Sequence, residues 1–406
     1  MAYLRKSTLN IKASRIFLIP KVLLSPLGLW FGQHVGGGLL SCVTSFAKLA
    51  TFSLFLFHLM LTAANLAVKK HSLPDLTFMT LVFVRLITTI SKIIALDASR
   101  KSLRMTIEEC FSIKNVPFLL RGHFEEMRKN CSRTPKSLLI PVAWVIFMYS
   151  PFWFTSFKTD YPLTIWLPFP EKQFPQFVNY VKKLTSGTLF LMAILNIGTI
   201  SLFTVMASIC KHMLKHMNQV LETLSHPELY QKVNMEPEKL TNDDFYNNKI
   251  NKTLVYVHKF HLKILGLVAC SNRTFSIILM LDVWAMIACH CVLTFSMTRS
   301  DLSFESKAAY AFNIIFNNLM FSTACYEAGE VTEESKHIKN RCFGTAWWTF
   351  SPDNVYFIKI IGLRSTDAVN YKVGFLNPAS LRTMKLPNVF RSEFELLFIQ
   401  GSIVHT

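Results

Sequence analysis

The chain contains seven long apolar stretches. Hydrophobicity within each stretch is continuous and does not alternate, which favours helices over strands. A helix of about 20 apolar residues crosses a hydrocarbon core of roughly 30 Å. In lipid, only helices and closed barrels pair all backbone N–H and C=O groups in hydrogen bonds. We therefore expect an all-α membrane protein with seven transmembrane helices, at 39–66, 74–96, 137–157, 187–211, 264–297, 307–326 and 373–400.

A shorter apolar stretch precedes them at 16–31. It contains Pro20, Lys21 and Pro26, which suit a short interfacial or re-entrant helix better than a span. The sequence thus predicts a cytoplasmic N-terminal segment, 1–38, that includes this helix.

Loop charge predicts the orientation. With the N-terminus in the cytoplasm, the inner segments contain 28 Lys and Arg residues and the outer loops contain 8. Basic residues concentrate on the cytoplasmic side of membrane proteins. We therefore expect a cytoplasmic N-terminus and an extracellular C-terminus.

Composition agrees with a bilayer environment. Hydrophobic residues make up 51% and charged residues 17% of the chain, against about 25% charged in soluble domains. This apolar content excludes disorder. The formal charge of +18 is mostly a topology signal, so we expect the lipid bilayer and not nucleic acid as a partner.

Cysteines and glycosylation sequons follow the same topology. All nine cysteines lie in predicted spans or inner segments, where free thiols are expected. The sequons at Asn130, Asn251 and Asn272 lie inside or at the inner edge of the membrane. We predict that none of the three is glycosylated.

No enzyme motif is found. HExxH, GxSxG, Walker-type glycine loops and GxGxxG are absent from the sequence. His258 and His261 share a helical face but lack a third ligand, and Cys289 and Cys291 point about 200° apart on a helix. We expect no catalytic residue, cofactor or metal.

Two basic residues occupy the second span. Lys92 is near an end, where it can snorkel to the interface. Arg85 is deeper, and a charge there is costly unless it faces a cavity or a partner. Arg85 therefore has either a functional role or a simpler one, snorkelling or an interhelical hydrogen bond.

The C-terminal third contains a series of motifs in a fixed order. They are His261 with Phe275-Ser276, CYEAGEVTEES at 325–335, Phe343 with Trp347, Arg364-Ser365-Thr366 ten residues before Gly374, and GFLNPASLRTM. This order and spacing resembles the insect odorant receptor family of seven-span ligand-gated cation channels. Ala328-Gly329 stands where that family usually has Gly-Asn, and Phe343 where it usually has Tyr.

The resemblance implies a tuning odorant receptor in the plasma membrane of a sensory neuron dendrite. Such a subunit binds a small volatile organic ligand and gates a non-selective cation channel with the odorant co-receptor, in a hetero-tetramer. The implied regions are a ligand-binding bundle of spans one to four (39–211), inner helix extensions (212–263), spans five and six (264–326), a cytoplasmic anchor (327–372), and a pore-lining span with a short tail (373–406).

The family's ligand site lies in the outer half of the bundle. The residues that would line it here are Met79, Val82, Phe83, Phe147, Tyr149, Ser150, Trp153, Phe154, Phe190, Ile194, Tyr310 and Asn313. Covering about 250–300 Å² of ligand at roughly 25 cal/mol per Å² yields about 6–7 kcal/mol before entropy costs. We therefore expect micromolar or weaker affinity. Each side chain has the alternative role of ordinary helix packing.

The resemblance also implies pore and anchor residues. The pore residues would be Arg391, Glu395, Leu397, Gln400 and Gly401. The anchor aromatics Phe343, Trp347 and Trp348 would be buried either between subunits or within one. The last span departs from a lipid-facing helix, because it contains Pro387 and several charges that suit a wet pore.

Three other classes of membrane protein match the sequence less well. A gustatory receptor of the same superfamily usually ends in a TYhhhhhQF-like motif, of which the chain has only LLFIQ. A seven-span G-protein-coupled receptor predicts the opposite orientation, an outer Cys pair and a DRY-like triplet. A transporter or membrane enzyme predicts internal repeats or clustered acids, which the sequence lacks.

Overall fold

The computed structural model describes residues 17–27, 29, 39–68, 73–111, 125, 129, 174–224, 244–298, 304–345 and 347–374. In this part of the chain the regular elements are all helices, as expected. They are α2 (Leu18–Leu24), α3 (Leu39–Val68), α4 (Leu73–Phe111), α6 (Pro175–Thr223), α9 (Asp244–Thr298), α10 (Phe304–Gly344), the 3-10 helix η2 (Trp347–Thr349) and α11 (Pro352–Arg364).

Four of these helices contain segments long and apolar enough to cross a membrane: Cys42–Val68, Met79–Met105, Pro175–Thr223 and Ile250–Phe295. They confirm the predicted spans one, two, four and five as helices. The predicted sixth span, 307–326, is helical within α10, although α10 is too polar to join the four by hydropathy. The predicted third span and nearly all of the seventh lie outside the described residues.

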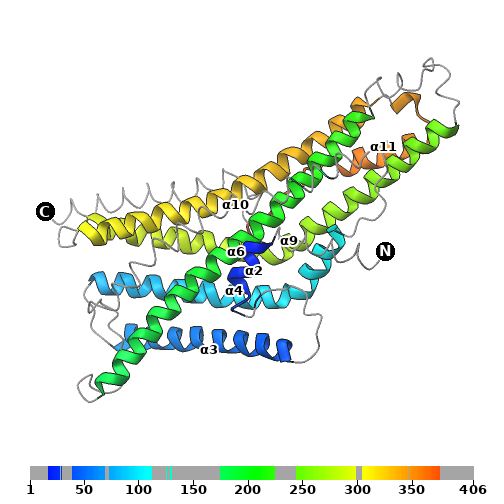
Figure 1. Cartoon of the computed structure of the whole chain (residues 1–406). Helices are drawn as coiled ribbons and strands as arrows, with labels where there is room; N and C mark the ends of the chain where they lie inside the picture. The colour runs from blue at the N-terminus through cyan, green and yellow to red at the C-terminus, as the bar shows by residue number, and fades with distance from the viewer. Residues whose placement is uncertain are drawn as a thin grey trace.

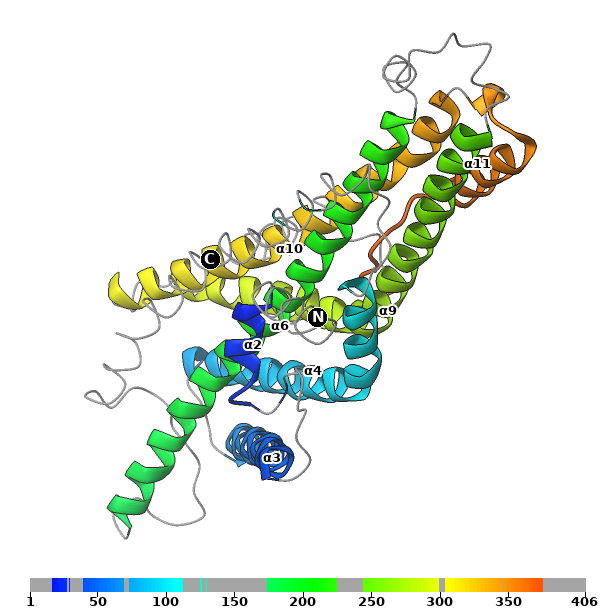
Figure 2. The ribbon, with the colours of Figure 1, turned by 45° about the vertical axis from the view of Figure 1, so that its right-hand side comes forward.

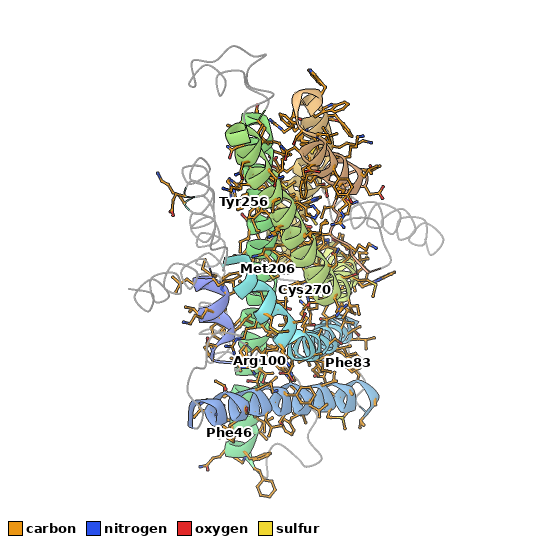
Figure 3. The ribbon with its side chains drawn as sticks, turned by 90° about the vertical axis from the view of Figure 1, so that its right-hand side faces the viewer. Phe46, Phe83, Arg100, Met206, Tyr256 and Cys270 are labelled. Carbon is orange, nitrogen blue, oxygen red and sulfur yellow. The ribbon has the colours of Figure 1, made fainter. Side chains whose placement is uncertain are left out.

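Helix α3 has an apolar outer face. Phe46, Leu49, Phe57 and Met60 are exposed on it, and α3 lies at the margin of the molecule beside α4 (Figures 1 and 3). Large apolar side chains exposed along one helix face are typical of contact with lipid. The inner face contacts α4, and the ion pair of Lys48 with Asp97 at 2.9 Å joins these two helices.

Helices α6, α9 and α10 are far longer than a bilayer requires. They contain 49, 55 and 41 residues, or roughly 60–80 Å at 1.5 Å per residue. They run side by side to one end of the molecule, where α11 packs against α9 and α10 (Figure 1). Helix α6 is central, because every residue from 201 to 210 is buried.

Helix α2 lies within the short apolar stretch predicted at 16–31. With seven residues it is too short to span a membrane. It packs against α6 at Gly198, where an added Cβ would lie 2.8 Å from Leu24 Cδ2. The lack of a side chain at Gly198 therefore permits the close approach of the two helices.

The chain after α11 turns back along α9, as the orange segment in Figure 2 shows. Asn272 of α9 holds this connector, residues 365–374, from both sides. Its Nδ2 donates to the Asn370 carbonyl, and its Oδ1 accepts from the Lys372 backbone N–H, both at 2.9 Å. A side chain engaged in this way supports the prediction that the Asn272 sequon is not glycosylated.

Candidate functional site

Five of the predicted ligand-site residues lie on α4 and α6, and their burial differs. Val82 is buried, and Ile194 packs against the same apolar cluster. Met79 is also buried but faces α3, where Asn65 Nδ2 approaches its sulfur at 3.9 Å. Phe83 and Phe190 are half-buried. The structure thus brings Val82 and Ile194 into one cluster and directs Met79 to another helix.

The other predicted residues cannot be placed in the same detail. Tyr310 and Asn313 lie in α10, with side chains outside the described part. Outside the described residues altogether lie Phe147, Tyr149, Ser150, Trp153, Phe154, Arg391, Glu395, Leu397, Gln400 and Gly401. Their roles stay predictions.

A second, smaller apolar cluster joins α4, α9 and α10. Leu81, Cys289 and Leu293 are buried in it, with Val292 and Ile314 packed around them. It is separate from the main cluster that contains Val82. The sequence reasoning did not identify this cluster, although Leu81 adjoins a residue that it did select.

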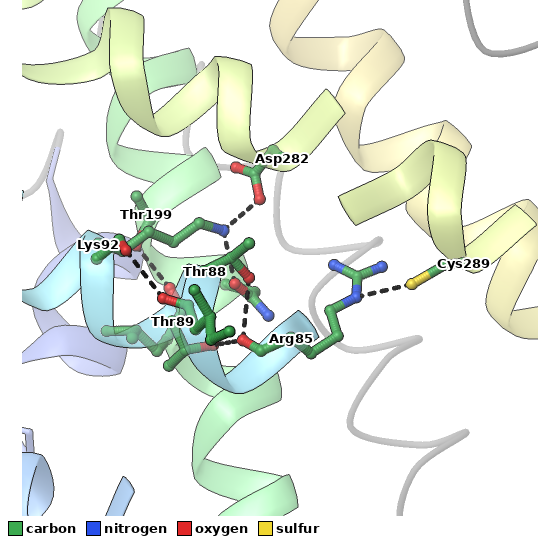
Figure 4. Close-up of polar contacts among 11 residues, drawn as sticks. Arg85, Thr88, Thr89, Lys92, Thr199, Asp282 and Cys289 are labelled. Atoms are coloured by element: carbon green, nitrogen blue, oxygen red, sulfur yellow. Dashed lines mark hydrogen bonds and ion pairs between the residues drawn. The ribbon is translucent and has the colours of Figure 1, made fainter. Parts of the chain in front are cut away.

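Lys92 is fully buried, contrary to the expectation that it snorkels. Its Nζ forms an ion pair with Asp282 of α9 and donates to Asn196 Oδ1 of α6 at 2.6 Å (Figure 4). Lys92 faces the interior of the bundle, where these two acceptors replace water. The expectation was wrong because the countercharge is 190 residues away in the sequence.

Arg85 makes an interhelical hydrogen bond. Its Nε donates to Cys289 Sγ of α9 at 3.1 Å, and its backbone carbonyl accepts from Thr88 and Thr89 at 2.9 and 2.7 Å. This is one of the two roles considered for a charge at this depth. Cys289 therefore acts here as a polar partner within an otherwise apolar cluster.

The two contacts have the same spacing on both helices. Arg85 and Lys92 are seven residues apart on α4, as are Asp282 and Cys289 on α9. Seven residues are about two helical turns, or roughly 10.5 Å. Antiparallel helices matched in this way present two polar pairs at successive levels between them. The pairs fix the register of α4 against α9.

These pairs do not resemble a catalytic or metal site. Among the described residues, no group of three His, Cys, Asp or Glu side chains could hold a metal ion. The ion pair instead connects three helices. Removing one partner of a buried pair costs about 3–5 kcal/mol, because the other charge remains in an apolar environment.

The predicted anchor aromatics differ from one another. Phe343 is 45% exposed, yet its ring covers Gly362 of α11, where an added Cβ would lie 3.0 Å from Cζ. Trp347 packs against the main cluster, whereas Trp348 is 69% exposed. Tyr356 and Leu363 of α11 are also exposed. Trp347 thus packs within this chain, and Trp348 is free to meet a partner.

Polar contacts join the C-terminal half of α6 to the C-terminal half of α10. Lys211 pairs with Glu327 at 2.7 Å, Arg341 pairs with Glu222, and Asn218 Nδ2 donates to the carbonyl and carboxylate of Glu334 at 2.9 Å. The seven cysteines whose side chains are described form no disulfide with one another. Burial raises the pKa of the Cys342 thiol to about 12, so this thiol is unreactive at neutral pH.

Comparison with known proteins identifies the family. The family model described as 7tm Odorant receptor matches residues 72–386. Two solved structures have the same fold. The insect olfactory receptor OR5 from Machilis hrabei in complex with eugenol is 14% identical, with a TM-score of 0.76, over 98% of this chain and 99% of that chain. The structure of OR5 from Machilis hrabei is 15% identical, with a TM-score of 0.75, over 98% of both chains.

No curated protein sequence matches the chain. At 14–15% identity the two structures establish the fold alone, and the family model carries the assignment. Its match covers most of the chain. The chain therefore belongs to the odorant receptor family, as a membrane receptor and not an enzyme.

Proposed function

We propose that this chain is a tuning odorant receptor. It binds a small volatile organic ligand and gates a non-selective cation channel together with the odorant co-receptor, in a hetero-tetramer of the plasma membrane. The observation that carries this proposal is the family match over residues 72–386. The shared fold over 98% of the chain supports it.

The ligand site would lie in the outer half of the bundle. Val82 and Ile194 would form its apolar wall on α4 and α6, with Phe83 and Phe190 beside them. Tyr149, Ser150, Tyr310 and Asn313 would supply polar contacts. Such a site is mostly apolar with few polar groups. OR5 binds eugenol, so small phenols belong in the first set of ligands tested.

The cytoplasmic side would hold the anchor. The excess of Lys and Arg in the inner segments supports a cytoplasmic N-terminus. The joined ends of α6, α9 and α10 with α11 would then project into the cytoplasm. Large apolar side chains exposed to water there mark an interaction site. Trp348, Tyr356 and Leu363 would face a neighbouring subunit.

The test is whole-cell current in cells that express this chain with and without an odorant co-receptor. A broad panel of volatiles, including eugenol, is applied at micromolar to millimolar concentration. We expect inward cation current only when both chains are present. Silence toward every volatile, with both chains at the surface, would count against the proposal and favour the gustatory alternative.

A further inference from the structure

Helix α9 is contacted on opposite sides over a short stretch. Asp282 faces α4 and α6, where it meets Lys92. Met280, two residues earlier, faces the connector at Gly374. Residues two apart on a helix point about 200° from each other. A movement of α9 away from α4 would therefore push or release the connector on its other side.

The contact with α4 and α6 consists of one cation and two acceptors. Lys92 Nζ binds Asp282 Oδ1 and, at 2.6 Å, Asn196 Oδ1. The side chains of Lys92 and Asp282 are 0% and 7% exposed. In this environment either charge alone is strongly disfavoured. The packed arrangement of the three helices is thus coupled to the intact ion pair.

The ion pair is incomplete on the side of Asp282. Its second oxygen, Oδ2, is buried and accepts no hydrogen bond from the part of the chain that the structure describes. A buried acceptor without a donor loses the hydrogen bonds that it makes in water. Separation of α9 from α4 would hydrate this oxygen, which partly offsets the broken pair. Such an offset lowers the free-energy cost of the separated arrangement.

The contact with the connector is tight. Gly374 has a φ of +58°, and a Cβ there would lie 2.4 Å from Met280 Sδ. Its backbone N–H donates to the Ser276 carbonyl at 2.9 Å. Gly374 is also where the connector ends and residues 375–406 begin. The position of α9 therefore sets the start of the final segment.

We propose that Lys92, Asp282 and Asn196 form a polar lock that holds the unliganded receptor closed. The lock keeps α9 against α4 and α6, and Met280 transmits this position to Gly374. Ligand binding among the outer ends of the helices would favour the separated arrangement. The three residues are positioning residues that need not touch the ligand. The inference rests on the proposed channel function.

The main test compares Asp282→Asn with Asp97→Asn. Each variant replaces the carboxylate of an interhelical ion pair, Asp282 on α9 and Asp97 on α4. Asp97 is a matched control, because it pairs with Lys48 at the surface of α3 and is not part of the lock. Ligand concentration–response curves and basal current are measured with the co-receptor present, at matched surface expression. We expect Asp282→Asn to lower the half-maximal concentration about tenfold and raise basal current, while Asp97→Asn matches wild type.

Two further variants test the lock even if Asp282→Asn fails to fold. Asn196→Ala removes one acceptor but leaves the ion pair, so we expect a shift of about threefold in the same direction. Met280→Ala removes the contact with Gly374 and leaves the lock intact. Both changes would act through one path. The shift in half-maximal concentration of the double variant should therefore be smaller than the product of the shifts of the two single variants.

The outcomes separate this inference from the proposed function. A wild-type response with Asp282→Asn and Asn196→Ala both indistinguishable from Asp97→Asn would overturn the lock alone. Multiplicative effects of Met280→Ala and Asn196→Ala would overturn its path through Gly374. A surface-expressed wild type that never conducts would overturn the channel proposal, and the lock with it.

Discussion

Two single residues that contact α9, Gly374 and Lys92, are each constrained by a specific feature of their surroundings. Gly374 combines a positive φ with a sulfur atom in the space that a side chain would fill. Lys92 combines complete burial with a charge that requires partners. Both residues contact α9 from opposite sides. Substitution of either residue is therefore expected to alter the position of α9.

Replacing Gly374 with Ala should impair gating. The left-handed conformation costs a non-glycine residue about 1–2 kcal/mol, and the new Cβ would overlap Met280. We expect ligand-evoked current to fall about tenfold at equal surface expression, measured by whole-cell recording. The matched control is Gly329→Ala in α10, where no atom lies within 4 Å of the added Cβ. Equal currents in the two variants would show that the Gly374 turn is unimportant.

The polar partners of Lys92 could not be predicted from local sequence. Hydropathy evaluates about 20 residues at a time, whereas Lys92 and Asp282 are 190 residues apart. One signal was present, because Asp282 is an acid within the apolar run LMLDVWAM of the fifth span and Lys92 is a base within the second. Two opposite charges in separate spans are best satisfied by each other.

At the level of elements, hydropathy predicted those helices that carry their own apolar signal. The spans in α3, α4, α6 and α9 are of this kind. The sequence also predicted the sixth span, 307–326, as a helix, although the second half of α10 is rich in Glu and Lys and the helix packs along α6. Hydropathy did not predict the lengths of α6, α9 and α10, because these helices continue well past the predicted spans. Inner helix extensions at 212–263 were expected only from the family resemblance.

The packing of α2 on α6 should depend on Gly198. A valine there would collide with Leu24, which is completely buried and cannot move aside freely. Overpacking of this kind costs about 1–3 kcal/mol. We expect Gly198→Val to lower the unfolding temperature of the purified receptor in detergent. Gly187→Val on the same helix has no atom within 4 Å of its Cβ. An equal loss in both variants would mean that helix propensity, and not α2, is responsible.

At the scale of the whole molecule, the chain combines a membrane bundle with a helical projection, which is formed by the joined ends of α6, α9 and α10 together with α11. In the bundle, exposed apolar residues such as Phe46 are compatible with lipid. On the projection, the exposed Trp348 and Tyr356 would meet water unless another chain covers them. This contrast was only partly predictable, because the sequence assigned all three anchor aromatics to one buried seam, whereas Trp347 packs against the main cluster and its neighbour Trp348 is exposed.

Assembly with the co-receptor should depend on Trp348. Truncating a residue that dominates an interface costs about 2 kcal/mol or more, and tryptophan is common among such residues. We expect Trp348→Ala to reduce co-purification of the co-receptor by about tenfold or more, without lowering the unfolding temperature of the chain alone. Phe46→Ala is the control, because it removes an exposed aromatic on the lipid-facing α3. Undiminished co-purification would place the subunit contact elsewhere.

The central claim is that ligand binding opens a channel made by the receptor itself. It is tested most directly in outside-out patches from cells that express this chain and the co-receptor, recorded with a pipette solution that contains no nucleotides. The account predicts that an active volatile evokes cation current in the patch, with the same half-maximal concentration as in whole cells. Current that disappears on excision and returns with GTP would contradict it.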